Sequence, residues 1–180
     1  KGVKKVISGQ KAKNRVRKIC FVTGTRAEYG LLSRLMRLVK DDEDMRLQVI
    51  ATNMHLMPEY GETYKEIEKD GFYIDKKVYM NKPSDDAQGV IASLVEEMQG
   101  MNDALSELKP DILVLLGDIY EILIAAQVAL IHRIPIAHIH GGEVTEGAFD
   151  DAIRHSVTKM SSLHFTSCEE YRHRVIQMGE

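Results

Sequence analysis

Short apolar runs alternate along the chain with longer stretches in which apolar residues recur at helical spacing. The runs Asp111–Leu116 and Ile134–Ile139 are continuous, as is typical of strands that helices cover on both faces. Between the runs, Glu28–Lys40 carries a leucine-rich stripe with basic residues between its members, which predicts a helix. We predict strands at Lys18–Thr23, Arg46–Thr52, Phe72–Tyr79, Asp111–Leu116, Ile134–Ile139 and Ser162–Thr166. We predict helices at Glu28–Lys40, Pro58–Asp70, Ile119–His132, Asp150–Met160 and Glu169–Met178. We also predict a long helix that residues 84–86 cap and that runs to Lys109.

This alternation predicts a doubly wound, Rossmann-like α/β domain with a parallel six-stranded sheet and right-handed crossovers. The third strand, Phe72–Tyr79, is more polar than the others, which indicates the edge of the sheet. In the common strand order 3-2-1-4-5-6, strands one and four are neighbours at the point where the topology switches, and ligands bind there. Thr25-Arg26 should then face Gly117-Asp118 across one crevice, with Glu143 one strand further along.

Composition and charge narrow the class of protein. With 180 residues, 44% hydrophobic and 28% charged, the chain suits one compact domain with a full core. Its net charge of −3 gives no reason to expect a nucleic-acid partner. Residues 1–17 hold seven basic residues and no acid, so we predict a flexible basic leader there and a folded domain over 18–180. A leader that contacts RNA or an anionic membrane is the less favoured interpretation.

Neither a membrane segment nor a disulfide framework is expected. The leader lacks the apolar segment of a signal peptide, and no later run is long enough to span a bilayer. Cys20 lies in an apolar run and is typical of a buried thiol, and with Cys168 it forms no spaced framework. These features favour a reducing cytoplasm and no membrane partner.

A first candidate site follows the first strand, at Gly24-Thr25-Arg26-Ala27-Glu28. N–H groups at a helix start and an arginine together suit a phosphate or a carboxylate, so Gly24, Thr25 and Arg26 are candidate anion-binding residues. The alternative is an ordinary strand-to-helix turn with Arg26 in solvent. The segment does not match Gly-x-Gly-x-x-Gly, so neither a nicotinamide nor a flavin dinucleotide is expected, and we predict no cofactor.

Carboxylates cluster after the fourth and fifth strands. Asp118 follows a buried strand, where partial desolvation can adapt it to proton transfer, and the alternative is a helix N-cap. Glu143 and the pair Asp150-Asp151 flank the next loop, and clustered carboxylates suit proton abstraction from carbon and protonation of a leaving group. The alternative for the pair is helix capping, although one member can cap while the other reaches the cleft. Arg154 and His155 are placed to pair with these acids.

Two histidines, His138 and His140, share one face of the fifth strand, because side chains alternate with a period of two. Such a pair could join a zinc site, but the ligand set is incomplete and no thiolate is close, so no metal is expected. The favoured interpretation makes one histidine structural and lets the other line the cleft. Gly141 and Gly142 would then let the backbone approach a ligand closely.

The motifs Gly24–Gly30, Gly117-Asp118, His138–Glu143 and Asp150–His155, in this order and spacing, together resemble the hydrolysing UDP-N-acetylglucosamine 2-epimerases. That family includes bacterial enzymes of the sialic-acid pathway and the epimerase half of a bifunctional animal enzyme. The resemblance runs from about Arg17 to Glu180 and implies a two-domain fold like that of the B-type glycosyltransferases, of which this chain matches only the first domain. In the family the second domain supplies much of the uridine and diphosphate site, so this chain should fold but be inactive alone.

The resemblance also implies a reaction. In the family, anti elimination of UDP across C1–C2 of UDP-N-acetylglucosamine gives a glycal, and addition of water then releases N-acetylmannosamine. Asp118 and one member of Asp150-Asp151 match family carboxylates that act as acids or bases, and Arg26 matches a residue near the nucleotide phosphates. His140 stands where some relatives carry a catalytic glutamate, so either His140 or Glu143 takes that proton-transfer role.

The residues leave several alternatives. A close relative of the family hydrolyses UDP-N,N′-diacetylbacillosamine, and this sequence suits that substrate equally. A non-hydrolysing epimerase or a glycosyltransferase would share the architecture, and a non-catalytic nucleotide-sugar-binding domain is the third interpretation. The full-length protein is expected to be a homo-oligomer, either a dimer or a tetramer. The apolar helix Ile119–Ile131 and the leucine-rich first helix are candidate dimer surfaces, although core packing explains both equally well.

Overall fold

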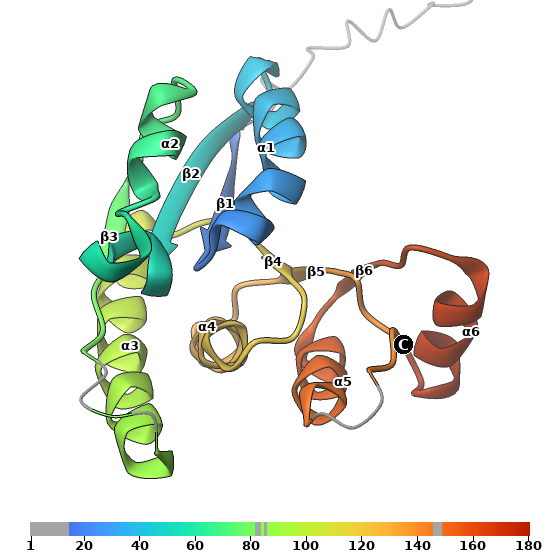
Figure 1. Cartoon of the computed structure of the whole chain (residues 1–180). Helices are drawn as coiled ribbons and strands as arrows, with labels where there is room; N and C mark the ends of the chain where they lie inside the picture. Colours follow the sequence, from blue (N-terminus) through green and yellow to red (C-terminus); the bar gives the residue numbers. More distant parts are fainter. Residues whose placement is uncertain (1–14, 82–83, 85, 146–148) are drawn as a thin grey trace, which may run out of the picture.

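Within the residues that the computed structural model describes, six parallel strands form one sheet in the order β3-β2-β1-β4-β5-β6 (Figure 1). The described residues are 15–81, 84, 86–145 and 149–180, so most of the predicted basic leader lies outside them. The strands are β1 (Arg17–Thr23), β2 (Met45–Thr52), β3 (Lys76–Val78), β4 (Ile112–Leu116), β5 (Ile136–Ile139) and β6 (Leu163–Phe165). The predicted fold class, the strand order and the edge position of the third strand are confirmed.

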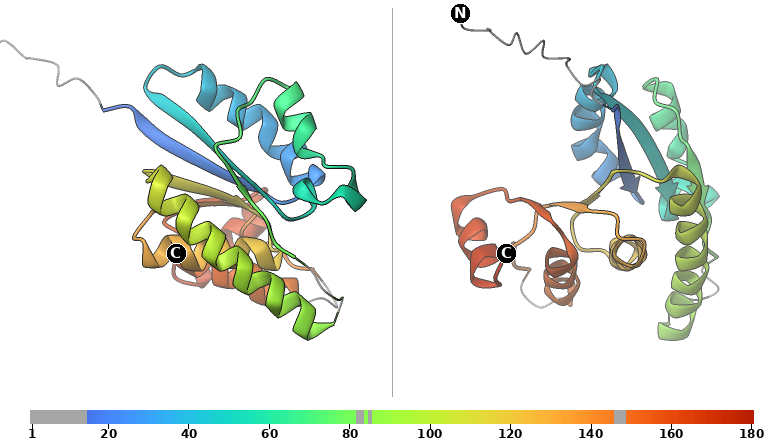
Figure 2. Two further views of the ribbon diagram at one scale, coloured as in Figure 1. Left: turned by 90° about the vertical axis from the view of Figure 1, so that its left-hand side faces the viewer. Right: turned by 180° about the vertical axis from the view of Figure 1, so that it is seen from behind.

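Helices cover both faces of the sheet (Figure 2). The α-helices of the described residues are α1 (Arg26–Asp41), α2 (Tyr64–Lys69), α3 (Ala87–Leu108), α4 (Tyr120–Ile131), α5 (Asp150–Met160) and α6 (Glu169–Gln177). Side chains of α1 and α2 pack on one face, and those of α3, α4 and α5 pack on the other. The predicted helices at Glu28–Lys40 and Asp150–Met160 are confirmed to within a turn, as is the predicted cap, since Asp86 accepts a hydrogen bond from the Gly89 N–H at 2.8 Å.

The continuous helix predicted at Pro58–Asp70 is wrong. The chain instead forms two 3₁₀ turns, Asn53–Leu56 and Pro58–Tyr60, before α2 begins. Gly61 and Glu62 have φ angles of 80° and 49°, in the left-handed region that a right-handed helix does not contain. These two residues therefore divide the segment, a break that the charged sequence pattern does not reveal.

The third strand is shorter than the predicted Phe72–Tyr79. Asp75 bonds to β2 with both its backbone and its side chain, because its N–H donates to the Val49 carbonyl at 2.9 Å and its carboxylate accepts from the Val49 N–H at 2.8 Å. The side chain thus replaces one bond of the backbone ladder, and regular pairing begins only at Lys76. Phe72 and Ile74, which precede the strand, are buried all the same.

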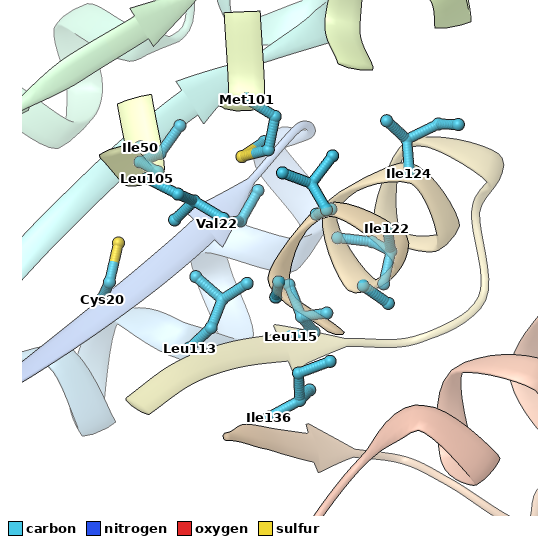
Figure 3. Close-up of a cluster of buried hydrophobic side chains, with 14 of the residues drawn as sticks. Cys20, Val22, Ile50, Met101, Leu105, Leu113, Leu115, Ile122, Ile124 and Ile136 are labelled. Atoms are coloured by element: carbon cyan, nitrogen blue, oxygen red, sulfur yellow. The ribbon is translucent and has the colours of Figure 1, made fainter. Parts of the chain in front are cut away.

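The core has two halves, one on each face of the sheet. Along β1, Cys20 and Val22 point to the face that α3 and α4 cover, whereas Ile19 and Phe21 point to the face that α1 covers. Figure 3 shows the first half, in which Met101 of α3 and the isoleucines of α4 close over β1, β4 and β5. Because apolar layers lie on both faces, the strands carry continuous apolar runs.

Helix α4 is apolar because it is internal. It buries Ile122, Ala125, Ala126 and Ala129 completely, so core packing accounts for these apolar residues. In the described part of the chain, no helix combines the length and the apolar content that crossing a bilayer requires. At its carboxyl end, however, α4 leaves Leu130 and Ile131 on the surface.

Candidate active site at the carboxyl edge of the sheet

A hollow of about 150 Å³ opens at the carboxyl ends of β1, β2 and β4. It is lined by Thr25, Asn53, Met54, Asp118, Ile119, Tyr120, Glu121, Phe149, Asp150 and Ile153. Thr25 follows β1 and Asp118 follows β4, and these strands are paired neighbours in the sheet. The predicted convergence of the two segments at the switch point is therefore present, and the start of α5 adds Asp150 to the same hollow.

The turn after β1 binds its own carboxylate. The N–H groups of Gly24 and Thr25 donate to Oε2 of Glu28, at 2.7 and 2.9 Å, and the Glu28 N–H donates to the Thr25 hydroxyl at 3.3 Å. This capping box satisfies two of the N–H groups that the sequence offered to an external anion. Burial raises the pKa of Glu28, while these hydrogen bonds oppose the change.

Arg26 does not line the hollow. Its Nε donates to Oε2 of Glu66 on α2 at 3.0 Å, and its side chain is 73% exposed. The expected contact between Arg26 and a phosphate stays a prediction, and it requires this guanidinium to leave Glu66. An exposed pair of this kind is weak, so the rearrangement costs at most about 1 kcal/mol.

Arg154 connects the acids around the hollow. This arginine of α5 is 3% exposed, forms an ion pair with Asp118 and contacts Asp151 at 2.5 Å. It also donates to the Glu143 carbonyl at 2.9 Å and to the Thr145 hydroxyl at 3.0 Å. The guanidinium thus fixes the position of Asp118 from behind and joins it to the loop after β5.

The pair Asp150-Asp151 divides its tasks. Asp150 lines the hollow, whereas Asp151 turns back to Arg154 and accepts the Thr145 N–H at 2.9 Å. One acid therefore stabilises the loop, and its neighbour faces the space where a ligand can bind. The sequence allowed this division but could not say which member had which task.

His138 is the structural histidine. It is fully buried, donates from Nε2 to the Gly117 carbonyl at 2.8 Å and has its Nδ1 3.2 Å from the Thr158 hydroxyl. Burial lowers the pKa of His138 to about 4, so the ring is neutral at pH 7. A neutral ring at this position holds the turn that precedes Asp118 against β5.

His140 lies apart from the hollow, in a second polar group with Glu143 and Ser167. Its Nδ1 is 3.6 Å from Oε1 of Glu143, which also accepts the Ser167 hydroxyl at 2.7 Å. Neither His140 nor Glu143 lines the hollow that holds Asp118. In the part of the chain that the structure describes, no three His, Cys, Asp or Glu side chains are grouped to hold a metal ion.

The two glycines of this loop make close contact with protein. A Cβ at Gly142, whose φ is 82°, would lie 2.4 Å from the Tyr171 carbonyl oxygen, and one at Gly141 would lie 3.0 Å from the Thr158 hydroxyl. The glycines thus let the loop pack on α5 and α6. The close approach to a ligand that the sequence suggested stays a prediction.

Two further buried carboxylates, of which Glu121 also lines the hollow, were not anticipated. Glu97 of α3 is fully buried, and Glu121 of α4 is 2% exposed and accepts a hydrogen bond from the Asn53 amide. Burial, with the nearby charge of Glu121, raises the pKa of Glu97 to about 9. The sequence carried a signal for the burial of Glu97, because this residue lies one helical turn from both Ser93 and Met101, which share its buried face.

Replacing Glu97 with Gln is expected to remove a pH dependence of stability. The folded protein holds the Glu97 proton more tightly than the unfolded chain does, so the free energy of unfolding falls as pH rises from about 4.5 to about 9. Glutamine mimics the protonated acid, and at pH 8 the variant should exceed the wild type in stability by several kcal/mol. Urea unfolding at pH 5 and pH 8 measures the difference.

The matched control is the adjacent, exposed Glu96, whose replacement by Gln should leave the wild-type pH dependence in place. Glu28 of α1 and Glu121 of α4 are the charged neighbours that also act on Glu97. If the Glu97→Gln variant and the wild type lose stability in parallel between pH 5 and pH 8, the raised pKa is wrong.

The fold and the hollow together define a doubly wound α/β domain with a carboxylate-lined hollow at its topological switch point, where domains of this class bind ligands. The family model of UDP-N-acetylglucosamine 2-epimerase matches residues 37–180. The chain belongs to this family of enzymes, which act on nucleotide sugars, and the predicted resemblance is confirmed.

Individual relatives agree with this assignment. The chain is 50% identical over 164 residues to the GDP/UDP-N,N′-diacetylbacillosamine 2-epimerase (hydrolyzing) of Campylobacter jejuni, covering 91% of this chain and 42% of the relative. It is 43% identical over 165 residues to the polysialic acid biosynthesis protein P7 of Escherichia coli, covering 92% and 42%. The chain thus spans less than half the length of the curated relatives it matches.

A solved structure confirms the fold. The UDP-GlcNAc 2-epimerase of Neisseria meningitidis, bound to UDP-GlcNAc, superposes with a TM-score of 0.78 at 21% identity. The match covers 91% of this chain and 43% of that one.

Proposed function

We propose that the protein is a hydrolysing UDP-sugar 2-epimerase in which this chain supplies the carboxylates Asp118 and Asp150. The observation that carries the proposal is the hollow at the switch point, where both acids come together in a chain of the epimerase family. Two acids from different elements, Asp118 after β4 and Asp150 at the start of α5, can act on different atoms of one sugar, as removal of a proton from C2 and loss of a group from C1 require.

The proposed reaction has two steps. In the first, a carboxylate takes the C2 proton of UDP-N-acetylglucosamine while the C1–O bond breaks, so that UDP leaves and a C1–C2 double bond forms. In the second, water adds its oxygen to C1 and C2 is protonated. The new proton enters on the face opposite to the one from which the first proton left, so the configuration at C2 is inverted and the product is N-acetylmannosamine. Arg154 supports both steps by holding Asp118 at the hollow.

His140 and Glu143 are the candidates for a further acid. They lie outside the hollow of this chain, in the loop after β5. Arg154 links this loop to the hollow, because it donates a hydrogen bond to the Glu143 carbonyl and pairs with Asp118. We propose that one of them transfers a proton once the site is complete. The uridine and diphosphate are assigned mainly to a second domain, with Gly24, Thr25, Arg26, Gly141 and Gly142 as contacts from this one.

The substrate has a second candidate, UDP-N,N′-diacetylbacillosamine. The observation in its favour is the 50% identity to the Campylobacter jejuni enzyme, whose name specifies that sugar. Both substrates carry an N-acetyl group at C2 and UDP at C1, so the proposed chemistry is the same for either. The free thiols of Cys20 and Cys168 suit a reducing compartment, and we place the protein in the cytoplasm.

The test uses the full-length protein in heavy water with each UDP-sugar in turn. We expect free UDP in a one-to-one ratio with the released sugar, and deuterium at C2 of that sugar. Deuterium in a UDP-sugar without free UDP would indicate the non-hydrolysing epimerase, whereas UDP release without exchange would indicate a transferase. No reaction but saturable binding would indicate a binding domain. The 180-residue chain should bind UDP only weakly by calorimetry, and tight binding would contradict the assignment of the uridine site.

A further inference from the structure

Glu121 is a third carboxylate in the hollow that holds Asp118 and Asp150. It lies in the first turn of α4, where the free N–H groups of the helix favour a negative charge. Asp118 pairs with Arg154 of α5. Glu121 instead accepts a hydrogen bond from Asn53, which follows β2. Asp118 therefore faces the α5 side of the hollow, and Glu121 faces the β2 side.

The backbone around Asn53 fixes the amide that holds Glu121. Asn53 has a φ of 49°, in the left-handed region, and begins the first 3₁₀ turn. This turn is attached to the turn after β1, because the His55 N–H donates to the Gly24 carbonyl at 3.1 Å. The His55 ring also lies 3.0 Å from the Thr23 hydroxyl. The Asn53 amide thus presents a well-anchored donor to the Glu121 carboxylate.

A neighbouring acid leaves the negative charge on Glu121. Glu97 is fully buried, and the charges that act on it are those of two other acids, Glu121 and Glu28. Because burial and the charge of Glu121 raise the pKa of Glu97 to about 9, Glu97 holds a proton at pH 7. Glu121 has the Asn53 amide and the start of a helix to stabilise its charged form, so it is available as a base.

A recess with the volume of one water molecule adjoins Glu121. Its volume is about 20 Å³, and it is lined by Asn53, Met54, Met57, Tyr60, Met80, Val90, Ser93, Tyr120 and Glu121. Four of these residues, Asn53, Met54, Tyr120 and Glu121, also line the hollow, so the two spaces share a wall. A buried water needs at least about 15 Å³ and about three polar partners. The Glu121 carboxylate, the Asn53 side chain and the Ser93 hydroxyl are such partners.

We propose that Glu121 is the base that takes a proton from the water that adds to C1 of the sugar, and that the recess supplies this water. This assignment rests on the proposed function, because it concerns the second step of that reaction. The water oxygen forms the new bond to C1, and the electrons of the C1–C2 double bond take up a proton from an acid at C2. The Glu121 carboxylate receives the proton that the water loses, and exchange with solvent then restores both groups.

Glu121→Gln in the full-length protein separates the two steps. Glutamine keeps an oxygen for the Asn53 amide but cannot take a proton from water. We expect UDP release to stay within about tenfold of the wild type, while addition of water slows by about 10² to 10⁴-fold, so that the glycal leaves the enzyme in place of the hydrated sugar. Proton NMR detects the glycal by the hydrogen on C1 of its double bond. The control Glu107→Gln, which alters an exposed acid paired with Lys76, should release no glycal.

The wild type and the variant together distinguish the role of Glu121 from the proposed function. A wild type that releases no UDP from either sugar would reject the proposed function, and the role of Glu121 with it. An active wild type beside a Glu121→Gln variant that forms hydrated sugar at the wild-type rate would overturn only the role of Glu121. A variant that loses UDP release as fully as the sugar product would also overturn it, because Glu121 would then act before water is added.

A second variant tests the recess without altering the carboxylate. Val90→Leu adds one methylene group, which occupies about the space of a water molecule, and keeps an aliphatic residue in α3. We expect addition of water to slow at least about tenfold and glycal to be released, with the circular dichroism of the wild type. The matched control is Val95→Leu, since Val95 lies on the same helix but is 63% exposed, and it should release no glycal. A folded Val90→Leu variant that hydrates the glycal at the wild-type rate would overturn the assignment of the water to the recess.

Discussion

Replacing Arg154 with Met is expected to lower the free energy of unfolding by about 3–5 kcal/mol. The methionine fills a similar volume but leaves Asp118 and Asp151 without their shared cation, in a place where the arginine is 3% exposed. It also removes donors from the Glu143 carbonyl and the Thr145 hydroxyl, so the loop after β5 loses its anchor. Urea denaturation at pH 7 measures the loss.

Two comparisons separate the buried charge from the general effect of removing an arginine. Arg26→Met removes an exposed pair with Glu66 and should cost less than about 1 kcal/mol. Adding Asp118→Asn to Arg154→Met should restore part of the lost stability, because it removes one unpaired carboxylate. A cost below 1 kcal/mol for Arg154→Met, or no recovery in the double variant, would show that Arg154 does not hold these acids.

Asp118→Asn in the full-length protein is expected to lower kcat by about 10² to 10⁴-fold with the fold retained. Asparagine keeps the shape of the side chain and a contact to Arg154, but it cannot take the proton from C2 of the sugar. Asp150→Asn should cause a comparable loss because Asp150 lines the same hollow. Asp151→Asn should act mainly on stability, since that side chain is engaged with Arg154 and Thr145.

Release of UDP under steady-state conditions measures these losses, and circular dichroism verifies the fold. The control is Glu107→Gln, which alters an exposed acid paired with Lys76 at the far end of α3 and should leave kcat unchanged. Full activity of a folded Asp118→Asn variant would end the assignment of Asp118 as an acid or base. An inactive wild type would instead reject the proposed function itself.

The sequence predicted most of the fold because the apolar runs and the strand order follow from local pattern. Strands that are covered on both faces must be apolar throughout, and β4 and β5 show this directly in Ile112–Leu116 and Ile136–Ile139. Their alternation with helices leaves few topologies, and the observed sheet order is the common one. Asp118 and Asp150 were therefore predicted near one edge from a single sequence.

Errors arose where one or two residues decide the backbone. The charged pattern of residues 58–70 predicts one helix, but Gly61 and Glu62 divide the segment with a left-handed turn. Helical propensity does not predict such a turn. Asp75 shortens β3 by pairing through its side chain, which no periodic pattern reports. The Arg26 side chain pairs with Glu66 on α2, 40 positions away in the sequence, which local pattern does not report, and its predicted contact with a phosphate stays untested.

The sequence by itself determined the order of the strands, the family and the edge of the sheet at which the acids gather, since these depend on periodicity and on motifs that a chain carries locally. Only the tertiary structure decided which acids share a hollow, because Asp118 follows β4 whereas Asp150 and Arg154 belong to α5. Burial likewise is a property of the packed molecule. Glu97 is one of several charged residues on α3, and it is buried only because α3 packs against the sheet and α4.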